Sequence, residues 1–112
     1  MKLTLNKSWE LCLKQWGHVI RRLKKDKTLD VWDLKREWNR KNGYGIADVY
    51  CECFFCEYMT THSPEDCSSC PGRKVDKDFD CYNDKYHFEH KPLKFYAKLR
   101  VLNKIRLAKK KG

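Results

Sequence analysis

The sequence predicts a small, mainly α-helical protein of the α+β class, in which the non-helical part consists of short strands or loops. Three observations support this fold class: apolar side chains recur at helical spacing in the first 45 residues, cysteines and turn residues crowd the middle, and a third helical pattern ends the chain. With 112 residues, the chain has the length of one domain. We therefore expect a single domain, 1–112, composed of a helical hairpin (1–45), a cysteine-rich module (46–90) and a basic C-terminal helix (91–112).

The first helix is expected over about residues 8–25, with Ser8 at its start. Its apolar side chains lie three or four positions apart and form one stripe: Trp9, Cys12, Leu13, Trp16, Val19, Ile20 and Leu23. Such a stripe predicts that the two tryptophans and Cys12 pack in the core rather than bind a ligand.

A second helix is expected to begin after Asp30, which is a good N-cap residue, and to end at Asn42-Gly43. Val31, Leu34 and Trp38 have helical spacing within it. The connection to the first helix is short, so the two helices are expected to pack as an antiparallel or steeply crossed hairpin.

The third helix is expected to begin at Pro92, a residue well suited to the first helical position. Its inward face is predicted to comprise Phe95, Leu99, Leu102 and Ile105. The basic side chains are expected on the outside, as the surface that binds a partner: Lys94, Lys98, Arg100, Lys104, Arg106 and Lys109.

The middle of the chain holds two C-x2-C pairs, Cys53-Phe54-Phe55-Cys56 and Cys67-Ser68-Ser69-Cys70, with ten residues between them. Tetrahedral Zn²⁺ takes four soft ligands, and each C-x2-C turn directs two thiolates to one point. Because four thiolates leave no position for a catalytic water, the pattern predicts one structural zinc ion held by Cys53, Cys56, Cys67 and Cys70.

Other uses of these cysteines remain open at this stage. Cys51 alternates with Cys53 and could replace it, and Cys81 could serve as a ligand if one of the four were turned away. A second site formed by Cys51, Cys81, His87 and His90 is chemically possible. An iron–sulfur cluster would accept the same four thiolates. A redox pair is disfavoured because acidic surroundings are expected to raise thiol pKa values, and disulfides are disfavoured by the odd number of seven cysteines.

No catalytic constellation is evident. Asp84, His87 and His90 follow both cysteine pairs, whereas metal-finger nucleases place their catalytic Asp-His between ligand pairs, and residues 91–112 contain no His, Asp or Glu. We therefore expect no enzymatic activity and no small-molecule substrate.

The net charge of +10 is unevenly distributed. Residues 1–50 carry +6, residues 51–90 carry −5 and residues 91–112 carry +9. An acidic cysteine module is atypical of zinc modules that grip phosphate, whereas the basic end of the chain could meet nucleic acid or an acidic protein surface. No apolar run of secretory or membrane-spanning length occurs, so we expect a cytoplasmic protein that does not act at a membrane.

The motifs Trp9-x2-Cys12-Leu13-Lys14-x-Trp16, Cys53-Phe54-Phe55-Cys56-Glu57-Tyr58 and Cys67-x2-Cys70-Pro71 resemble small cysteine-rich proteins encoded by phages and prophages, over roughly residues 8–72. Some small phage proteins, including metal-binding ones, are anti-CRISPR inhibitors. The resemblance implies a type II inhibitor, directed at a Cas9-type ribonucleoprotein in the cytoplasm of a bacterial host cell.

The sequence therefore leaves two candidate functions. In the first, the zinc-stabilised protein docks on a host nucleic-acid-processing effector and blocks nucleic-acid loading or activation. In the second, it is a small zinc-containing regulatory protein that binds nucleic acid directly through its basic C-terminal helix.

Overall fold

The computed structural model describes residues 3–45, 48–62 and 70–111, and these ranges contain four α-helices and no strand. The helices are α1 (Leu5–Lys25), α2 (Val31–Lys41), α3 (Phe54–His62) and α4 (Pro92–Lys111), and a 3₁₀ turn, η1 (Tyr50–Glu52), precedes α3. The mainly helical prediction is confirmed. Of the short strands or loops expected in the middle, the described residues form loops, and α3 is a helix that the sequence pattern did not predict.

Helix α1 begins at Leu5, three residues earlier than expected, because Thr4 caps it. The side chain of Thr4 accepts a hydrogen bond of 3.1 Å from the backbone N–H of Lys7. Ser8 is instead buried inside the first turn, and its hydroxyl donates to the carbonyl of Leu5 at 2.7 Å. The predicted apolar stripe is largely confirmed: Trp9, Cys12, Trp16, Val19, Ile20 and Leu23 are buried.

Helix α2 packs on α1, as the hairpin prediction required. Asp30 caps it by accepting from the N–H of Asp33 at 3.1 Å, and Gly43 follows its end with φ of 88°, a left-handed conformation that glycine adopts at little cost. Glu37 of α2 accepts a 2.8 Å hydrogen bond from His18 and forms a 3.1 Å ion pair with Arg22, so it ties α2 to α1.

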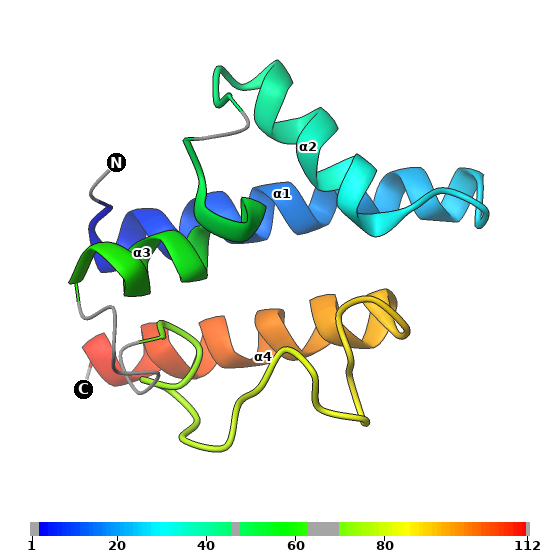
Figure 1. Cartoon of the computed structure of the whole chain (residues 1–112). Helices are drawn as coiled ribbons and strands as arrows, with labels where there is room; N and C mark the ends of the chain where they lie inside the picture. Colours follow the sequence, from blue (N-terminus) through cyan, green and yellow to red (C-terminus); the bar gives the residue numbers. More distant parts are fainter. Residues whose placement is uncertain (1–2, 46–47, 63–69, 112) are drawn as a thin grey trace.

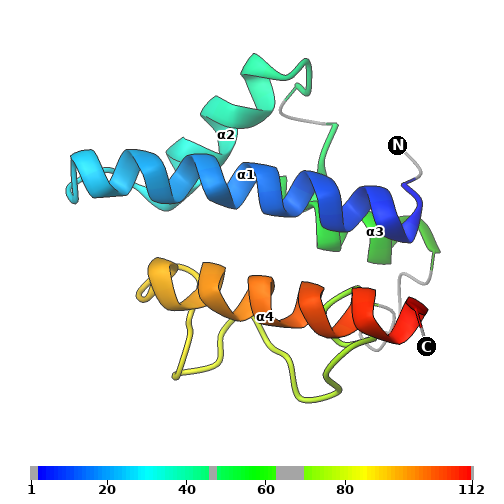
Figure 2. The same cartoon turned by 180° about the vertical axis from the view of Figure 1, so that it is seen from behind.

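Helix α4 runs alongside α1 in the opposite direction (Figures 1 and 2). Phe95, Leu99 and Leu102 are buried as predicted, and the rings of Phe95 and Trp16 lie 4.8 Å apart. Ile105 was predicted to face inward, and this is wrong: its side chain is 41% exposed. Ile105 lies to one side of the helix face that carries the buried residues, so α4 has apolar residues outside as well as inside.

Helix α3 and the turns of residues 70–91 complete the core. The ring of Phe55 contacts Trp9 of α1 with centroids 4.8 Å apart, and Phe79 packs between Phe55 and Phe95 at 6.4 and 5.9 Å. The buried apolar side chains form one cluster that joins all four helices to the turn segment. In the described part of the chain, no helix is both long and apolar enough to cross a membrane.

Candidate functional site

Four cysteines line one cavity of about 110 Å³ beside α2, α3 and the turn segment: Cys51, Cys53, Cys56 and Cys81. The rest of its wall is aromatic except for one cation: Trp16, Trp32, Lys35, Tyr82, Phe88 and Phe95. The fold thus brings Cys81, about 25 residues away in sequence, to the first C-x2-C pair. Cys67 of the second predicted pair lies outside the described residues.

The first C-x2-C pair lies at the N-terminal end of α3. The carbonyl of Cys53 accepts from the N–H of Glu57 at 2.9 Å, so Cys53 immediately precedes the first helical turn. The thiol of Cys56 and the backbone N–H groups of Cys56 and Phe55 all act to lower the pKa of the Cys53 thiol. Amide donors two and three residues beyond a cysteine stabilise a thiolate and are typical partners of metal-bound sulfur.

These contacts shift the pKa values of Cys53 and Cys56 in opposite directions. The hydrogen bond from Cys56 lowers the pKa of Cys53 to about 5, with help from the charge of Lys35, although burial opposes the shift. The pKa of Cys56 is raised, because its thiol donates to the sulfur of Cys53 and then faces the charge of that thiolate. The expectation that acidic surroundings would raise the thiol pKa values is therefore wrong for Cys53, whose nearest partners are a thiol, two amides and a lysine.

Cys70 and Cys81 bring two more thiols toward this pair. The carbonyl of Cys70 accepts from the N–H of Lys74 at 3.1 Å, and the N–H groups of Arg73 and Gly72 act to lower the pKa of its thiol, which repeats the spacing seen at Cys53. Burial raises the pKa of both Cys70 and Cys81, and each thiol also lies within electrostatic range of Cys53. Of the predicted zinc ligands, Cys53 and Cys56 line the cavity together with the alternative ligand Cys81, whereas Cys70 packs against the same core without lining the cavity.

The described cysteine side chains do not surround a common point that a metal ion could occupy. Among the residues that the structure describes, no three Cys, His, Asp or Glu side chains form a group that could hold a metal ion as they stand. The donor chemistry nevertheless fits a soft divalent cation, because the converging groups are thiols and two of them accept backbone N–H bonds.

The predicted alternative ligands His87 and His90 lie apart from the cavity wall. Their rings are 4.3 Å apart, and Nδ1 of His87 accepts from the backbone N–H groups of Glu89 and His90 at 3.1 and 3.3 Å. The structure therefore does not bring these two histidines together with Cys51 and Cys81 as one ligand group. Asp84 accepts a 2.6 Å hydrogen bond from Lys91 through its backbone carbonyl.

The turn that carries Cys51 and Cys53 has a strained backbone, and hydrogen bonds to α1 and α3 hold it in place. Cys51 and Glu52 have φ of 52° and 54°, in the left-handed region that non-glycine residues seldom adopt. The carbonyl of Glu52 accepts from the side chain of Gln15 at 2.9 Å, and the N–H of Tyr50 donates to Glu57 of α3 at 2.9 Å. These contacts fix the entry into α3, and with it the position of Cys53.

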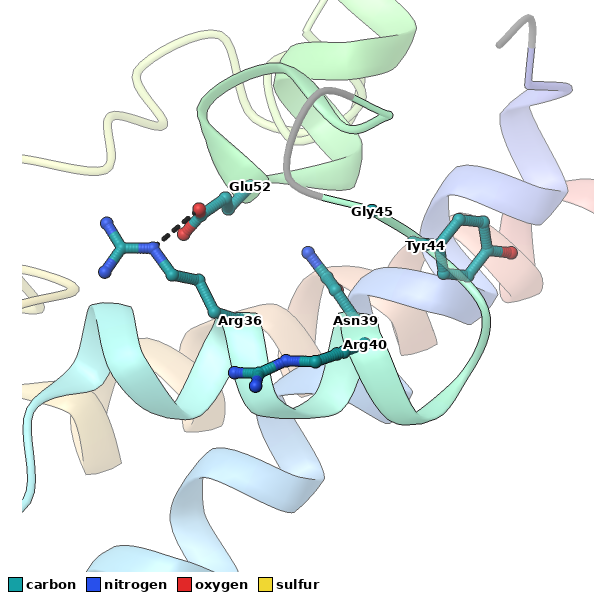
Figure 3. Close-up of a pocket in the computed structure, with 6 residues that line it drawn as sticks. All are labelled: Arg36, Asn39, Arg40, Tyr44, Gly45 and Glu52. Atoms are coloured by element: carbon teal, nitrogen blue, oxygen red, sulfur yellow. Dashed lines mark hydrogen bonds and ion pairs between the residues drawn. The ribbon is translucent and has the colours of Figure 1, made fainter.

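A pocket of about 330 Å³ lies on the other side of this turn, and Figure 3 shows the residues that line it. In it, Nε of Arg36 donates to Oε1 of Glu52 at 2.7 Å, and the Glu52 side chain is only 11% exposed. Asn39 lies in the same wall and accepts from Gln15 at 3.0 Å. Because Arg36 pairs with Glu52 and Asn39 pairs with Gln15, we assign this pocket a structural role in holding the turn.

Lys35 is the residue of this region that sequence reasoning missed. Its side chain is buried, with a 3% exposed fraction, and Nζ lies 4.7 Å from the ring centroid of Trp32. A signal was present in the sequence: Lys35 lies four residues after Val31 and three before Trp38, at the spacing of the apolar face of α2.

The six predicted partner-binding residues of α4 fall into two groups. Lys98 and Arg106 are engaged within the protein: Lys98 forms a 3.1 Å ion pair with Asp76, and Arg106 donates to Asn6 at 2.7 Å with its guanidinium 5.1 Å from the ring centroid of Trp9. The other four side chains are exposed: Lys94, Arg100, Lys104 and Lys109.

Comparison with protein-family models, with curated protein sequences and with solved structures finds no match for this chain.

Proposed function

We propose that this chain is a zinc-stabilised binding protein that docks, through the outer face of α4, on an acidic surface of a nucleic-acid-processing effector. As the sequence resemblance implies, the first partner to test is a Cas9-type ribonucleoprotein of a bacterial host cell, with inhibition by blocked nucleic-acid loading or activation as the effect. The observation that carries the proposal is the mixed apolar and basic character of that face.

The outer face of α4 exposes large apolar side chains. Leu93, Val101 and Ile105 are 56%, 51% and 41% exposed, and Leu93, Ala97, Val101 and Ile105 follow one another at steps of four residues. On a helix, such a series forms one inclined ridge, which is the element that packs into the grooves of another helix. Core packing within this chain is already supplied by the opposite face, so the ridge is available to a partner.

Basic side chains border the ridge. Lys94, Arg100 and Lys104 are exposed, and the chain from residue 91 onward contains no acidic residue. An apolar strip with a basic border complements a protein surface that has an apolar centre and acidic residues around it. A nucleic-acid backbone would pair with the lysines, but it would leave most of the apolar ridge in water, so a protein surface is the better complement.

The second candidate is direct nucleic-acid binding, and one observation favours it. The C-terminal end of α1 also carries exposed basic side chains, Arg21, Lys24 and Lys25, and it lies beside the N-terminal end of α4 in both views (Figures 1 and 2). Two basic helix ends on one side of the molecule could contact neighbouring phosphates.

Binding measurements with purified components separate these candidates. The zinc-loaded full-length chain is tested against a Cas9 ribonucleoprotein and against a random DNA duplex over a salt series, together with an assay of target cleavage. We expect binding to the ribonucleoprotein and loss of cleavage. A steep fall of log affinity with log salt on the bare duplex, with no retention on the ribonucleoprotein, would overturn the proposal in favour of nucleic-acid binding.

Matched variants test the face itself. Val101→Asp places a charge on the apolar ridge, and Lys104→Glu reverses its border, so each is expected to weaken effector binding about tenfold or more. Lys27→Glu makes the same charge change in the exposed α1–α2 connection and is expected to bind normally. Equal losses in Lys104→Glu and Lys27→Glu would indicate a general charge effect and contradict docking through α4.

A further inference from the structure

Lys35 is a buried cation that has no carboxylate partner among the described residues. Three aromatic rings surround Nζ, with centroids at 4.7 Å for Trp32, 5.5 Å for Phe88 and 5.8 Å for Trp16. Ring faces attract a cation, but they do not neutralise it, and a buried ammonium group is costly unless an anion lies nearby. A negative charge close to this position would offset that cost.

The groups available to supply that charge are thiols. Lys35 and four cysteines line the same cavity, and the carboxylate of Glu52, the acidic residue between Cys51 and Cys53, is paired with Arg36 at 2.7 Å on the far side of the turn. A buried cation that faces a cluster of cysteines fits a site in which the cysteines are ionised.

Two of the thiols already have the surroundings of metal-bound sulfur. Cys53 and Cys70 each begin a turn: the carbonyl of Cys53 accepts from the N–H of Glu57 at 2.9 Å, and the carbonyl of Cys70 accepts from the N–H of Lys74 at 3.1 Å. The amides two and three residues beyond each cysteine act to lower the pKa of its thiol. This repeated pattern marks Cys53 and Cys70 as the first residues of two metal-binding turns. Cys56 completes the first turn. Cys81 is a partly buried thiol that shares the cavity wall with Cys53 and Cys56, whereas Cys51 in the same wall is exposed.

We propose that Cys53, Cys56, Cys70 and Cys81 hold one Zn²⁺ ion and that Lys35 is its buried counter-charge. Binding releases the protons of the coordinating thiols to solvent and forms four Zn–S bonds, which gives a centre of net charge −2. The ammonium group of Lys35 offsets half of that charge.

This assignment differs from the sequence prediction at one ligand. Cys81 takes the place of Cys67, so the second pair of ligands comes from two turns of the 70–91 segment rather than from one C-x2-C motif. The ion would then join α3 to the turn segment, which contains neither helix nor strand in its described residues. The inference refines the metal part of the proposed function, and its test involves no partner.

The ligand set is tested on the full-length chain with Co²⁺ in place of Zn²⁺, because the Co²⁺ absorption spectrum reports how many thiolates bind. Single Cys→Ser variants are compared at positions 51, 53, 56, 67, 70 and 81. We expect the four-thiolate spectrum to be lost at 53, 56, 70 and 81 and kept at 51 and 67. Loss at 67 with retention at 81 would overturn the assignment, as would a Cys53–Cys56 disulfide in a glutathione buffer with no metal bound.

The role of Lys35 is tested by zinc affinity, measured by competition with a chelator at one pH. Lys35→Met keeps the buried stem and removes the charge, and we expect its zinc affinity to fall about tenfold, whereas Lys35→Arg retains most of it. Circular dichroism of each variant with saturating zinc checks that the helices form. An unchanged affinity in a folded Lys35→Met variant would refute the counter-charge, and it would leave the docking proposal untouched.

Discussion

The Nε atom of Arg36 donates a 2.7 Å hydrogen bond to Oε1 of Glu52, and this ion pair joins α2 to the turn that carries Cys51 and Cys53. The contact holds a carboxylate that is almost fully buried and whose second oxygen, Oε2, has no hydrogen-bond partner among the residues that the structure describes. It also raises the pKa of Arg36, because the hydrogen bond and the charge of Glu52 both favour the guanidinium form. The geometry of the cysteine cavity therefore depends on a residue that carries no sulfur.

Removing the guanidinium is expected to destabilise the fold. Arg36→Met leaves the Glu52 carboxylate buried without its cation, so the free energy of unfolding measured by urea titration should fall. Arg40→Met is the control, since Arg40 lies one turn further along α2, lines the same pocket and is exposed. It should change stability by less than about 0.5 kcal/mol. Equal effects of both variants would show that the ion pair contributes nothing specific.

The two faces of α4 should respond differently to truncation. Leu99 is fully buried against the core, whereas Val101 is 51% exposed on the ridge. Leu99→Ala is expected to cost about 2–5 kcal/mol of unfolding free energy, because it leaves a cavity. Val101→Ala should cost less than about 0.5 kcal/mol. A large loss of stability in Val101→Ala would mean that the ridge is part of the core and is not available to a partner.

Replacement by alanine should lower the stability of the protein at one glycine and raise it at another. A Cβ at Gly72 would lie 2.5 Å from Cδ2 of the buried Phe79 ring, so Gly72→Ala should destabilise the protein by about 1–3 kcal/mol. At Gly17 in α1 the nearest atom is the Tyr96 hydroxyl at 3.4 Å, an ordinary contact. Gly17→Ala should therefore stabilise the helix by roughly 0.5–1 kcal/mol. Thermal unfolding of both variants measures the direction of each stability change. An unchanged stability in Gly72→Ala would contradict the packing of Phe79 against this turn.

Glu37 should make the α1–α2 contact sensitive to acid. Burial opposes its ionisation, but the hydrogen bond with His18 and the charges of Arg22 and Lys41 outweigh burial and lower its pKa below the ordinary 4.5. A lowered folded-state pKa gives stability that is present above about 4.5 and is lost as pH falls through the lower folded value.

The matching experiment compares the wild-type protein with Glu37→Gln in urea at a series of pH values. The wild-type protein should be more stable at pH 6, and the difference should shrink steadily below pH 4.5. If the difference grew as the pH fell, the sign of the Glu37 shift would be wrong.

The helices could be predicted from the sequence because their signals are local. Asp30 and Gly43 cap α2 as expected, and Pro92 begins α4. The start of α1 was misplaced because two serine or threonine residues compete for the cap, and Thr4 makes the bond. Helix α3 was missed because the C-x2-C pair suggested a turn, whereas Cys53 ends that turn and Cys56 already belongs to the helix.

The candidate site could be predicted only in part. The first cysteine pair is a local motif, but Cys81 reaches the same cavity through the path of the turn segment, which no spacing in the sequence reveals. Lys35 shows a similar limit. Its helical spacing with Val31 and Trp38 places it on the apolar face, yet only the tertiary fold shows that it faces the cysteines.

The central claim is that thiolate-bound zinc stabilises this protein, and native mass spectrometry of the full-length chain, purified without added metal, tests it most directly. We predict one zinc ion per chain, with the mass deficit of the protons lost from the coordinating thiols, and no zinc in the Cys53→Ser, Cys56→Ser double variant. Removal of the ion by a chelator should lower the thermal midpoint. A metal-free chain whose helix content and thermal midpoint do not change when zinc is added would contradict the claim.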